Sequence, residues 1–283
     1  MITFRTFTTA DIPAGLSLCR IAGWNQIEND WKTFLKADAA SSSVAIDQYG
    51  DIAGTVGTIR YSSFSWIGML LVHPDFRRRG IGSALLQEAM RIIGTNTTSR
   101  LDATPAGREV YLKLGFLDQY SLARMVRDNP AVEKKFLTVT NIRKLTSNDL
   151  NTIKDWDERV FGANRNFLLS SILSSETSSA WIYEKDNSIR GYAFCRAGHD
   201  FSYAGPLVAD DIEVAILLLT KILDQTKGKK LAIDIPESSA KWRTYLESIG
   251  FVQQRRFIRM YQGNHPGDGV LTDTYAIGGP EYG

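Results

Sequence analysis

The chain of 283 residues is 43% hydrophobic and 11% aromatic, a composition typical of ordinary globular proteins. Its length exceeds that of a typical single domain, so two domains are expected. The formal net charge is only +2, which excludes a global electrostatic attraction to nucleic acid or to a membrane surface. The N-terminus lacks the apolar core of a signal peptide and the longest apolar run is too short to span a bilayer, so a cytoplasmic protein is expected.

Residues that commonly form disulfides or bind metals are few. Cys19 and Cys195 are the only cysteines, and two in a chain of this length do not make a disulfide framework. We expect both to be buried reduced thiols. His73, His199 and His265 lie far apart in the sequence and have no metal-ligand spacing, so no metal site is predicted.

Hydrophobic periodicity in the first half of the chain predicts alternating strands and helices. Asp11 is expected to cap the N-terminus of the first helix. The predicted strands cover residues 2–6, 43–47, 52–61, 66–72, 100–103 and 121–127, and the predicted helices cover 12–22, 26–35, 81–93 and 107–114. This order predicts an α/β (α+β) mixed sheet with helices on both faces.

The most informative stretch lies between the strand that ends at Val72 and the helix that begins at Ile81. Pro74 cannot donate to a strand ladder, so the strand must finish there or splay. Three arginines then precede two glycines at alternate positions: Arg77, Arg78, Arg79, Gly80 and Gly82. Bare backbone N–H groups at the positive end of a helix dipole suit a phosphate or pyrophosphate, and the arginines add positive charge. The alternative is an ordinary basic turn with two loop glycines.

Other glycine-rich phosphate loops fit this stretch poorly. The chain contains no Gly-x-x-x-x-Gly-Lys-Ser/Thr string, and Leu85 stands where a dinucleotide fingerprint needs its third glycine. The pattern Arg77-x-x-Gly80-x-Gly82 instead resembles the acetyl-CoA loop of the GNAT superfamily of N-acetyltransferases, usually written Arg/Gln-x-x-Gly-x-Gly/Ala. The preceding Leu70–Pro74 stretch is similar to the fourth strand of that family.

This resemblance implies that acetyl-CoA is the co-substrate. The residues expected to hold it are Leu71, Val72, Arg77, Arg78, Arg79, Gly80, Ile81, Gly82 and Ser83. Backbone N–H groups near Leu71 and Val72, where such strands splay in the family, are expected to polarise the thioester carbonyl. A strand that merely ends at Val72 is equally compatible with the sequence.

The second half of the chain repeats the plan of the first. The predicted strands cover residues 141–146, 180–184, 189–197, 201–208 and 230–235, and the predicted helices cover 149–160 and 212–227. The segment Leu101–Pro105 corresponds to Ile233–Pro236, and Ala123–Met125 corresponds to Ile258–Met260. An offset of about 132–135 residues indicates duplication, with a chance similarity of two α/β domains as the alternative. We therefore expect two GNAT-like acyl-CoA N-acyltransferase domains in tandem.

The expected domains are residues 1–128 and 136–283, joined by a linker over Asp128–Lys135 that contains Asn129-Pro130. Where the arginine–glycine loop should recur, the second half has the Ala209–Glu213 stretch, with three carboxylates that would repel a pyrophosphate. Gly205-Pro206 is expected to interrupt the equivalent strand. The second domain is therefore predicted to be degenerate and not to bind acetyl-CoA. The Val270–Ile277 stretch of the glycine-rich tail either wanders or adds a strand that closes over a site.

Acetyl transfer to an amine needs a group that protonates the leaving thiolate, and Tyr111 is the candidate. Its helix matches the family helix that carries a tyrosine beside the CoA sulfur, and a phenol with a pKa of about 10 can donate a proton at neutral pH. The alternative is a core tyrosine, because Tyr245 occupies the same place in the repeat.

The general base is less clearly marked. Many relatives carry a glutamate on the fourth strand, but residues 64–69 contain no carboxylate. Asp102 is the candidate that binds the substrate ammonium or accepts its proton through water, with a helix-capping or turn role as the alternative. Deprotonation through water is the default. His73 is assigned a loop or capping role.

The acceptor side is expected between the first two helices, as the resemblance implies. Trp24, Asn25, Asp30 and Trp66 are the predicted substrate-binding residues, while Trp31 has the helical spacing of a core residue. The predicted function is an N-acetyltransferase that moves acetyl from acetyl-CoA to a primary amine of a small molecule by direct attack. The alternative is a catalytically silent acyl-CoA-binding sensor or interaction protein. The expected partners include no nucleic acid and no membrane, and a monomer or homodimer is expected.

Overall fold

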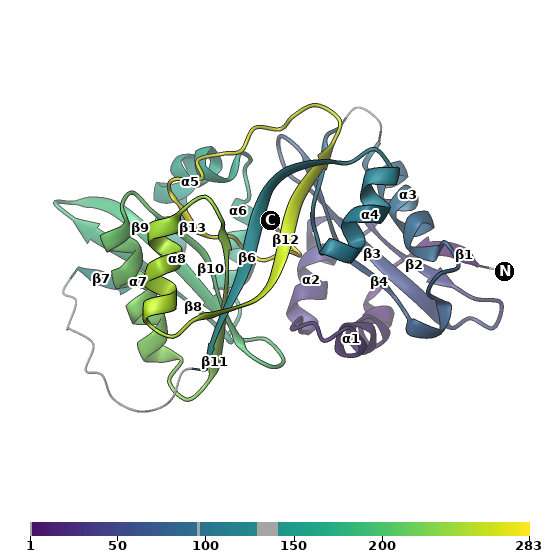
Figure 1. Ribbon diagram of the computed structural model, residues 1–283, viewed down its shortest axis with the longest axis horizontal. Helices are drawn as coiled ribbons and strands as arrows, with labels where there is room; N and C mark the ends of the chain where they lie inside the picture. The colour runs from purple at the N-terminus through teal and green to yellow at the C-terminus, as the bar shows by residue number, and fades with distance from the viewer. Residues whose placement is uncertain (1, 95–96, 129–140) are drawn as a thin grey trace. The chain divides into compact units, whose positions relative to one another are not determined.

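The computed structural model describes residues 2–94, 97–128 and 141–283. The predicted linker therefore lies outside the described residues, apart from Asp128. The chain folds as two compact units (Figure 1). Unit 1 comprises residues 1–118, 259–266 and 281–283, and unit 2 comprises residues 119–258 and 267–280.

The elements that begin in the first half of the sequence follow the predicted order. They are β1 (Thr3–Thr6), η1 (Thr9–Asp11), α1 (Ile12–Ile21), α2 (Glu28–Ala37), β2 (Ser42–Ile46), β3 (Ile52–Arg60), β4 (Ser65–Val72), η2 (Pro74–Phe76), α3 (Ile81–Ile93), β5 (Ser99–Ala103), α4 (Pro105–Lys113) and β6 (Leu117–Asp128). The strand order in unit 1 is β1-β2-β3-β4-β5, followed by the C-terminal end of β12 (Val252–Gln262).

The second half repeats this order. Its elements are β7 (Ile142–Lys144), α5 (Ser147–Phe161), α6 (Asn166–Leu173), β8 (Ser178–Lys185), β9 (Ser188–Arg196), β10 (Ser202–Ala209), α7 (Ile212–Gln225), β11 (Lys230–Pro236), α8 (Ala240–Ser248), β12 and β13 (Thr274–Ala276). In unit 2 the strand order is β6-β11-β10-β9-β8-β7, with β13 paired to β10. The mixed α/β fold with helices and a mixed sheet is confirmed.

Two glycines of β3 show how helices cover both faces of the unit 1 sheet. A Cβ added to Gly54 would lie 2.9 Å from Leu85 of α3, whereas one added to Gly57 would lie 2.6 Å from Phe34 of α2. Side chains three positions apart on a strand point to opposite faces, so α2 and α3 pack on opposite sides. Only glycine permits either helix to approach this closely.

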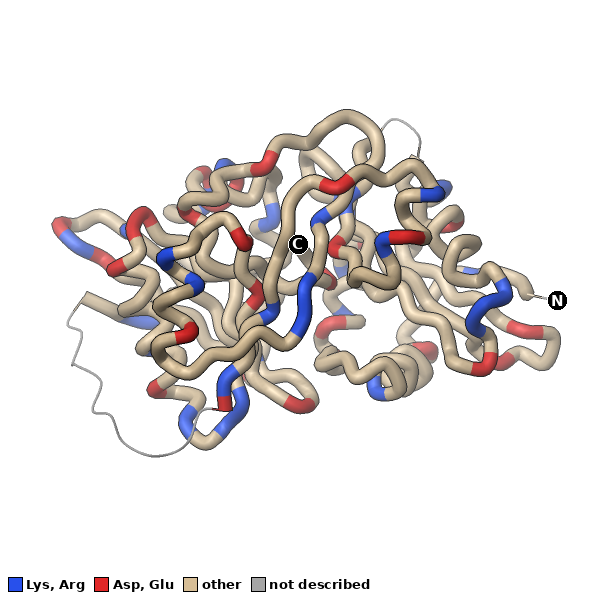
Figure 2. The backbone as a smooth tube through the Cα atoms, in the orientation of Figure 1, with Lys and Arg blue, Asp and Glu red and all other residues tan. Residues whose placement is uncertain are grey.

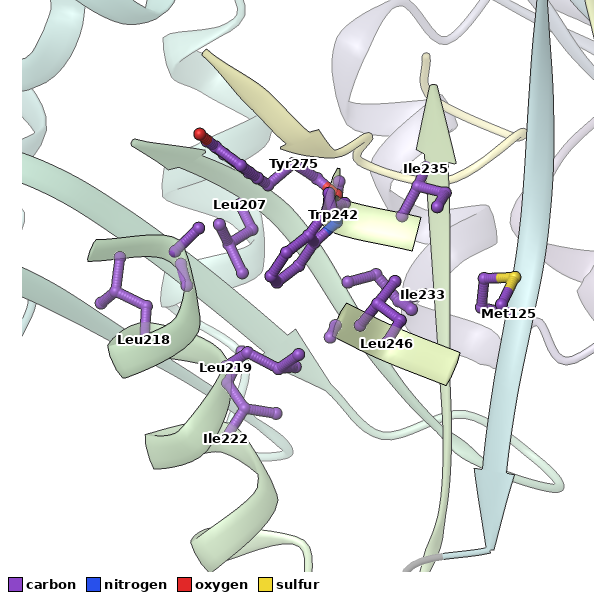
Figure 3. Close-up of a cluster of buried hydrophobic side chains, with 14 of the residues drawn as sticks. Met125, Leu207, Leu218, Leu219, Ile222, Ile233, Ile235, Trp242, Leu246 and Tyr275 are labelled. Atoms are coloured by element: carbon purple, nitrogen blue, oxygen red, sulfur yellow. Dashed lines mark hydrogen bonds between the residues drawn. The ribbon is translucent and has the colours of Figure 1, made fainter. Parts of the chain in front are cut away.

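Unit 2 has the same arrangement. A Cβ at Gly191 of β9 would lie 2.6 Å from Val214 of α7. Gly191 thus permits the close approach of α7, just as Gly54 permits that of α3. A large hydrophobic cluster of the unit lies on this face, between α7, α8 and the strands (Figure 3). Its labelled side chains converge on Trp242 and Leu246 of α8. The exclusion of these apolar surfaces from water is the main force that holds the helices against the sheet.

A repeated corner at the start of each half supports the duplication. In unit 1, Arg5 donates two hydrogen bonds of 2.7 Å to the Asp11 carboxylate, which also accepts from the Thr8 backbone N–H and hydroxyl. In unit 2, Arg143 and Asp149 form the same pair, with both hydrogen bonds 2.8 Å long. Asp11 occupies the predicted N-cap position of α1, but its side chain forms no capping hydrogen bond to α1, because its carboxylate is used one turn earlier, in this corner.

Neither cysteine is in a disulfide. Cys19 and Cys195 are buried free thiols, as predicted, and burial raises the pKa of each to about 12. No helix in the described ranges is long and apolar enough to cross a membrane.

Candidate active site

The arginine–glycine loop lies between β4 and α3, where the sequence places it. Its arginines make this turn blue in Figure 2. Gly80 adopts a left-handed conformation with φ of +77° and directly precedes the first residue of α3. Arg78 also has a positive φ, of 60°. The first turn of α3 contains no acidic residue, so no carboxylate of that turn repels an anion from the unpaired N–H groups of the helix start.

Neither glycine of this turn is crowded by side chains or distant backbone. A Cβ added to Gly80 would meet no atom within 4 Å, and one added to Gly82 would meet only Val72, at 3.7 Å. Arg77 donates to the carbonyl of Val72 at 3.1 Å, which ties the loop to the end of β4. The guanidinium of Arg79 lies 5.6 Å from the Phe76 ring. His73 caps the short η2 helix by accepting from the Asp75 backbone N–H, which confirms its predicted capping role.

The strand before the loop carries an irregularity that the sequence does not announce. Gly57 of β3 pairs with Gly68 and Thr55 pairs with Leu71, so two residues of β4 stand opposite one of β3. Met69, buried in this bulge, has a left-handed φ of +53°, and the Thr55 hydroxyl donates to its carbonyl at 2.9 Å. Such bulges re-aim backbone groups, and this one lies directly before Leu71 and Val72.

Strands β4 and β5 pair only at their starts, Ser65 with Ser99 and Trp66 with Arg100. No further pair joins them in the part of unit 1 that the structure describes. Strands β10 and β11 of unit 2 likewise pair only from Ser202 to Ala204. Both units therefore have two parallel strands that separate towards their carboxyl ends.

In unit 2 the chain's own tail fills this gap. Strand β13 pairs with β10 at Leu207 and Val208, and the N–H of Ile277 donates to the carbonyl of Asp234 on β11 at 3.0 Å. The Ile277 carbonyl approaches Gly205 so closely that a Cβ there would lie 2.1 Å from it. The tail stretch predicted either to wander or to add a strand adds one.

The start of α7, the equivalent helix of unit 2, is already capped by a carboxylate of the chain. The Asp211 side chain caps α7 by accepting from the Val214 N–H at 2.7 Å, and Arg190 pairs with Asp210 at 2.6 Å. Strand β10 runs through Gly205 and Pro206, but its pairing with β9 is interrupted there, between Ala204 and Leu207. The predicted interruption therefore affects the pairing and not the course of the strand.

Tyr111 lies on α4, half-buried, with its ring over Gly107 and 6.0 Å from the ring of Phe116. Burial raises the pKa of Tyr111 to about 12, so the phenol keeps its proton over the physiological range. The Tyr111 hydroxyl forms no hydrogen bond to any residue that the structure describes. Its predicted role as an acid stays a prediction.

Asp102 lies at the end of β5 in a buried ion pair. Arg259 of β12 donates to its two carboxylate oxygens at 2.8 and 2.9 Å, and the guanidinium lies 4.8 Å from the Trp66 ring. The sequence analysis did not assign Arg259 any role, although the repeat pairs it with Arg124. This ion pair favours a structural carboxylate over a mobile general base.

The predicted acceptor residues occupy different environments. Trp24 is half-buried and Asn25 is buried, both in the turn between α1 and α2. Asp30 is buried and caps α2 by accepting from the Ile27 N–H at 2.7 Å. Trp66 is fully buried beneath Arg259, and Trp31 is a core residue stacked on Phe7, as its spacing predicts.

The last three residues of the sequence belong to unit 1 and reach this same region. Tyr282 donates to the Asp30 carboxylate at 2.9 Å, and Gln26 donates to the Glu281 carboxylate at 3.1 Å. The Glu281 carbonyl packs against Gly68, the residue before the bulge. No local sequence signal indicates these contacts, because 252 positions separate Tyr282 from Asp30.

Comparison with known proteins shows the family of the chain. Residues 38–117 match one family model described as an acetyltransferase (GNAT) domain, and residues 153–275 match a second model of the same description. The chain belongs to the GNAT acetyltransferase family. It is a tandem member, with one GNAT domain in each half, and GNAT domains generally use acyl-CoA.

Individual GNAT relatives match nearly the whole length of the chain. The holothin acyltransferase of Pseudoalteromonas sp. (strain SANK 73390) is 26% identical over 256 residues, which covers 85% of both proteins. A crystal structure of a candidate acetyltransferase from Pyrococcus horikoshii has a TM-score of 0.85 at 23% identity and covers 100% of this chain and 96% of its own. A tandem GNAT protein from the clavulanic acid biosynthesis pathway has a TM-score of 0.67 at 13% identity, with 94% and 99% coverage.

Proposed function

We propose that unit 1 transfers an acetyl group from acetyl-CoA to a primary amine of a small molecule. The observation that carries this proposal is the contrast between the two helix starts. The first turn of α3 follows three arginines and Gly80 and contains no acidic residue, whereas α7 is capped by Asp211. An anion is favoured at the first and opposed at the second. Family membership supports transferase chemistry and an acyl-CoA donor.

The residues of unit 1 fit the proposed donor. The α3 turn has space at Gly80 and Gly82 for a pyrophosphate, and the gap between β4 and β5 suits an extended arm. The filled gap of unit 2 supports this fit, because there the same strand arrangement accommodates an extended peptide. Acetyl-CoA supplies a thioester whose acyl carbon is open to attack by an amine.

The chain's part in the reaction follows from these positions. The register of β4 directs the N–H groups of Leu71 and His73 towards β3, so the backbone N–H of Val72, just after the bulge at Met69, donates to the thioester oxygen as negative charge develops there. The amine nitrogen bonds to the acyl carbon, the carbon–sulfur bond breaks, and Tyr111 protonates the sulfur. Water accepts the proton that the substrate amine loses, and solvent returns a proton to the Tyr111 phenolate. Asp102 is held by Arg259 in a buried ion pair and takes no proton from the amine in this scheme.

The degenerate role of the second domain is part of this proposal. The tail in the gap between β10 and β11, together with the carboxylates at the α7 start, supports a unit that holds no acyl-CoA. We propose that the second domain has a structural role and stabilises the fold.

Thiol release from acetyl-CoA, measured against a panel of primary amines, tests the proposed activity. We expect amine-dependent release by at least one member of the panel. Binding of acetyl-CoA without turnover on any amine would favour the second candidate, an acyl-CoA sensor. The commitment of Asp102 to Arg259 is the observation in favour of that candidate.

A further inference from the structure

Arg255 on β12 is a half-buried arginine whose charge is not matched in the structure. Among the described residues its guanidinium forms no hydrogen bond and no ion pair. Its neighbour Arg256 differs, because it donates to Glu237 at 3.1 and 3.2 Å. In Figure 2 this basic stretch of β12 is blue. The five N–H donors of Arg255 therefore have no acceptor among the described residues.

The surroundings of Arg255 in unit 2 already contain a second cation. Side chains alternate along a strand, so Arg255 shares a face of β12 with Phe257. The Phe257 ring lies 5.2 Å from the guanidinium of Arg124, on the neighbouring strand β6. This face therefore brings Arg255 towards Arg124.

The single carboxylate of this cluster is already occupied. Arg124 donates to both oxygens of Asp234, at 2.8 and 2.7 Å, and the Tyr203 hydroxyl donates to the same group at 3.1 Å. Partial burial and the charge of Arg124 lower the pKa of Arg255, although Asp234 opposes the shift. Two guanidinium groups thus lie near one carboxylate in a partly desolvated place, and only Arg124 is hydrogen-bonded to it, so an added anion relieves the unmatched charge of Arg255.

The fold itself does not need a cation at this position. Arg259 corresponds to Arg124 in the repeat, and the same offset places Tyr120 at the position that corresponds to Arg255. Tyr120 packs against the apolar cluster of Leu122, Phe257 and Ile277. Since the neutral Tyr120 occupies this position in one repeat, the fold does not require the charge of Arg255 in the other.

We propose that Arg255, backed by Arg124, binds an oxyanion, the carboxylate or phosphate group of a small molecule, on this face of unit 2. The planar guanidinium fork matches either group with two parallel hydrogen bonds. Phe257 and Phe201, 5.2 and 5.8 Å from the Arg124 guanidinium, exclude water beside the charge and strengthen the attraction. The proposed site consists of unit 2 residues, whereas the α3 turn belongs to unit 1, and this proposal does not depend on acetyl transfer.

Calorimetric titration with inorganic phosphate and, separately, with acetate tests this site. The measurements use the Gly82→Asp background, so that the α3 turn does not contribute. We expect at least one probe to bind, and Arg255→Gln to weaken it by about tenfold or more, the loss expected for a charged hydrogen bond. Arg256→Gln is the matched control and should bind like its parent. Binding of phosphate alone or of acetate alone identifies the preferred group.

Thermal unfolding in buffer without either anion provides a second readout. Arg255→Gln should melt at or above the temperature of its parent, because it removes repulsion from Arg124. A clear drop in melting temperature would make Arg255 a packing residue and overturn the proposal. Equal affinity of the Arg255→Gln and parent proteins, or no binding of either probe, would also overturn it. Acetyl-CoA binding by the protein with Gly82 intact is measured separately, so failure here does not affect the proposed activity.

Discussion

Asp102 and Arg259 form a buried two-pronged ion pair in unit 1, with hydrogen bonds of 2.8 and 2.9 Å. Asp234 and Arg124 form the same pair in unit 2, at 2.8 and 2.7 Å. Each pair takes its aspartate from one half of the sequence and its arginine from the other. The residues at the end of each half therefore complete the unit begun by the other half.

Removing Arg259 should destabilise the protein strongly. Arg259→Met leaves Asp102 as a buried carboxylate without its counter-ion, so we expect the free energy of unfolding to fall by about 3–5 kcal/mol. Urea denaturation measures the change. The double variant Asp102→Leu/Arg259→Met should recover most of the loss, because neither charge then remains. Arg256→Met is the control, since that exposed pair with Glu237 is worth about 1 kcal/mol or less. A single variant as stable as wild type would refute the structural role.

Tyr111→Phe should retain acetyl-CoA affinity and lower turnover by about 100-fold, the scale of a lost general acid. Since the pKa of Tyr111 is raised to about 12, ionisation of this phenol should not reduce the wild-type rate at mildly alkaline pH. Steady-state rates of thiol release from pH 7 to pH 10 check both statements. Tyr245→Phe, at the equivalent position of unit 2, is the control and should be fully active. An unchanged rate in Tyr111→Phe would remove Tyr111 from the mechanism.

The Asp11 corner gives a stability that depends on pH. Arg5 and Thr8 lower the pKa of Asp11 from 3.8 to about 2, so this group stabilises the fold above its unfolded pKa and loses that effect as pH falls through the folded value. We expect Asp11→Asn to cost about 2 kcal/mol at pH 7 and only a small fraction of that near pH 2. Urea denaturation at several pH values measures this difference. A cost that does not depend on pH would contradict the charge-based account.

Tyr282→Phe tests whether the C-terminal residues support the acceptor side. The variant loses the 2.9 Å hydrogen bond to Asp30 but keeps its ring stacked on Phe34, 5.7 Å between centroids. One hydrogen bond of about 1 kcal/mol corresponds to a rise of about fivefold in the KM of the amine. The KM of acetyl-CoA should stay at the wild-type value. Equal changes in both constants would indicate a general loss of structure instead.

Much of the fold could be predicted from local signals. Helix α3 was predicted over Ile81–Ile93, the bounds observed, because its amphipathic period begins after Gly80 and ends before Gly94. The strand and helix order of both halves also followed from periodicity and turn residues. In the second half the periodicity predicts no element for α6, α8 or β12; α6 has only eight residues, which give about two turns of pattern.

The parts that could not be predicted depend on distant contacts. Arg259 and Asp102 lie 157 positions apart, and only tertiary structure shows which aspartate each repeated arginine serves. The left-handed backbone of Met69 has no signal in its residue type. The predicted domain boundaries, 1–128 and 136–283, follow the duplication, whereas the compact units take β12 residues and the last three residues into unit 1. The linear order of a repeat does not show how its strands are shared.

The central claim is that acetyl-CoA binds in unit 1 alone, at the start of α3. Calorimetric titration of wild type, Gly82→Asp and Gly82→Ala with acetyl-CoA tests it most directly. A Cβ at Gly82 meets only Val72 at 3.7 Å, so both variants should fold, but the aspartate places negative charge beside the pyrophosphate. We predict one site per chain in wild type, the same site in Gly82→Ala, and no measurable binding in Gly82→Asp. Two sites per chain, or undiminished affinity in Gly82→Asp, would contradict the account.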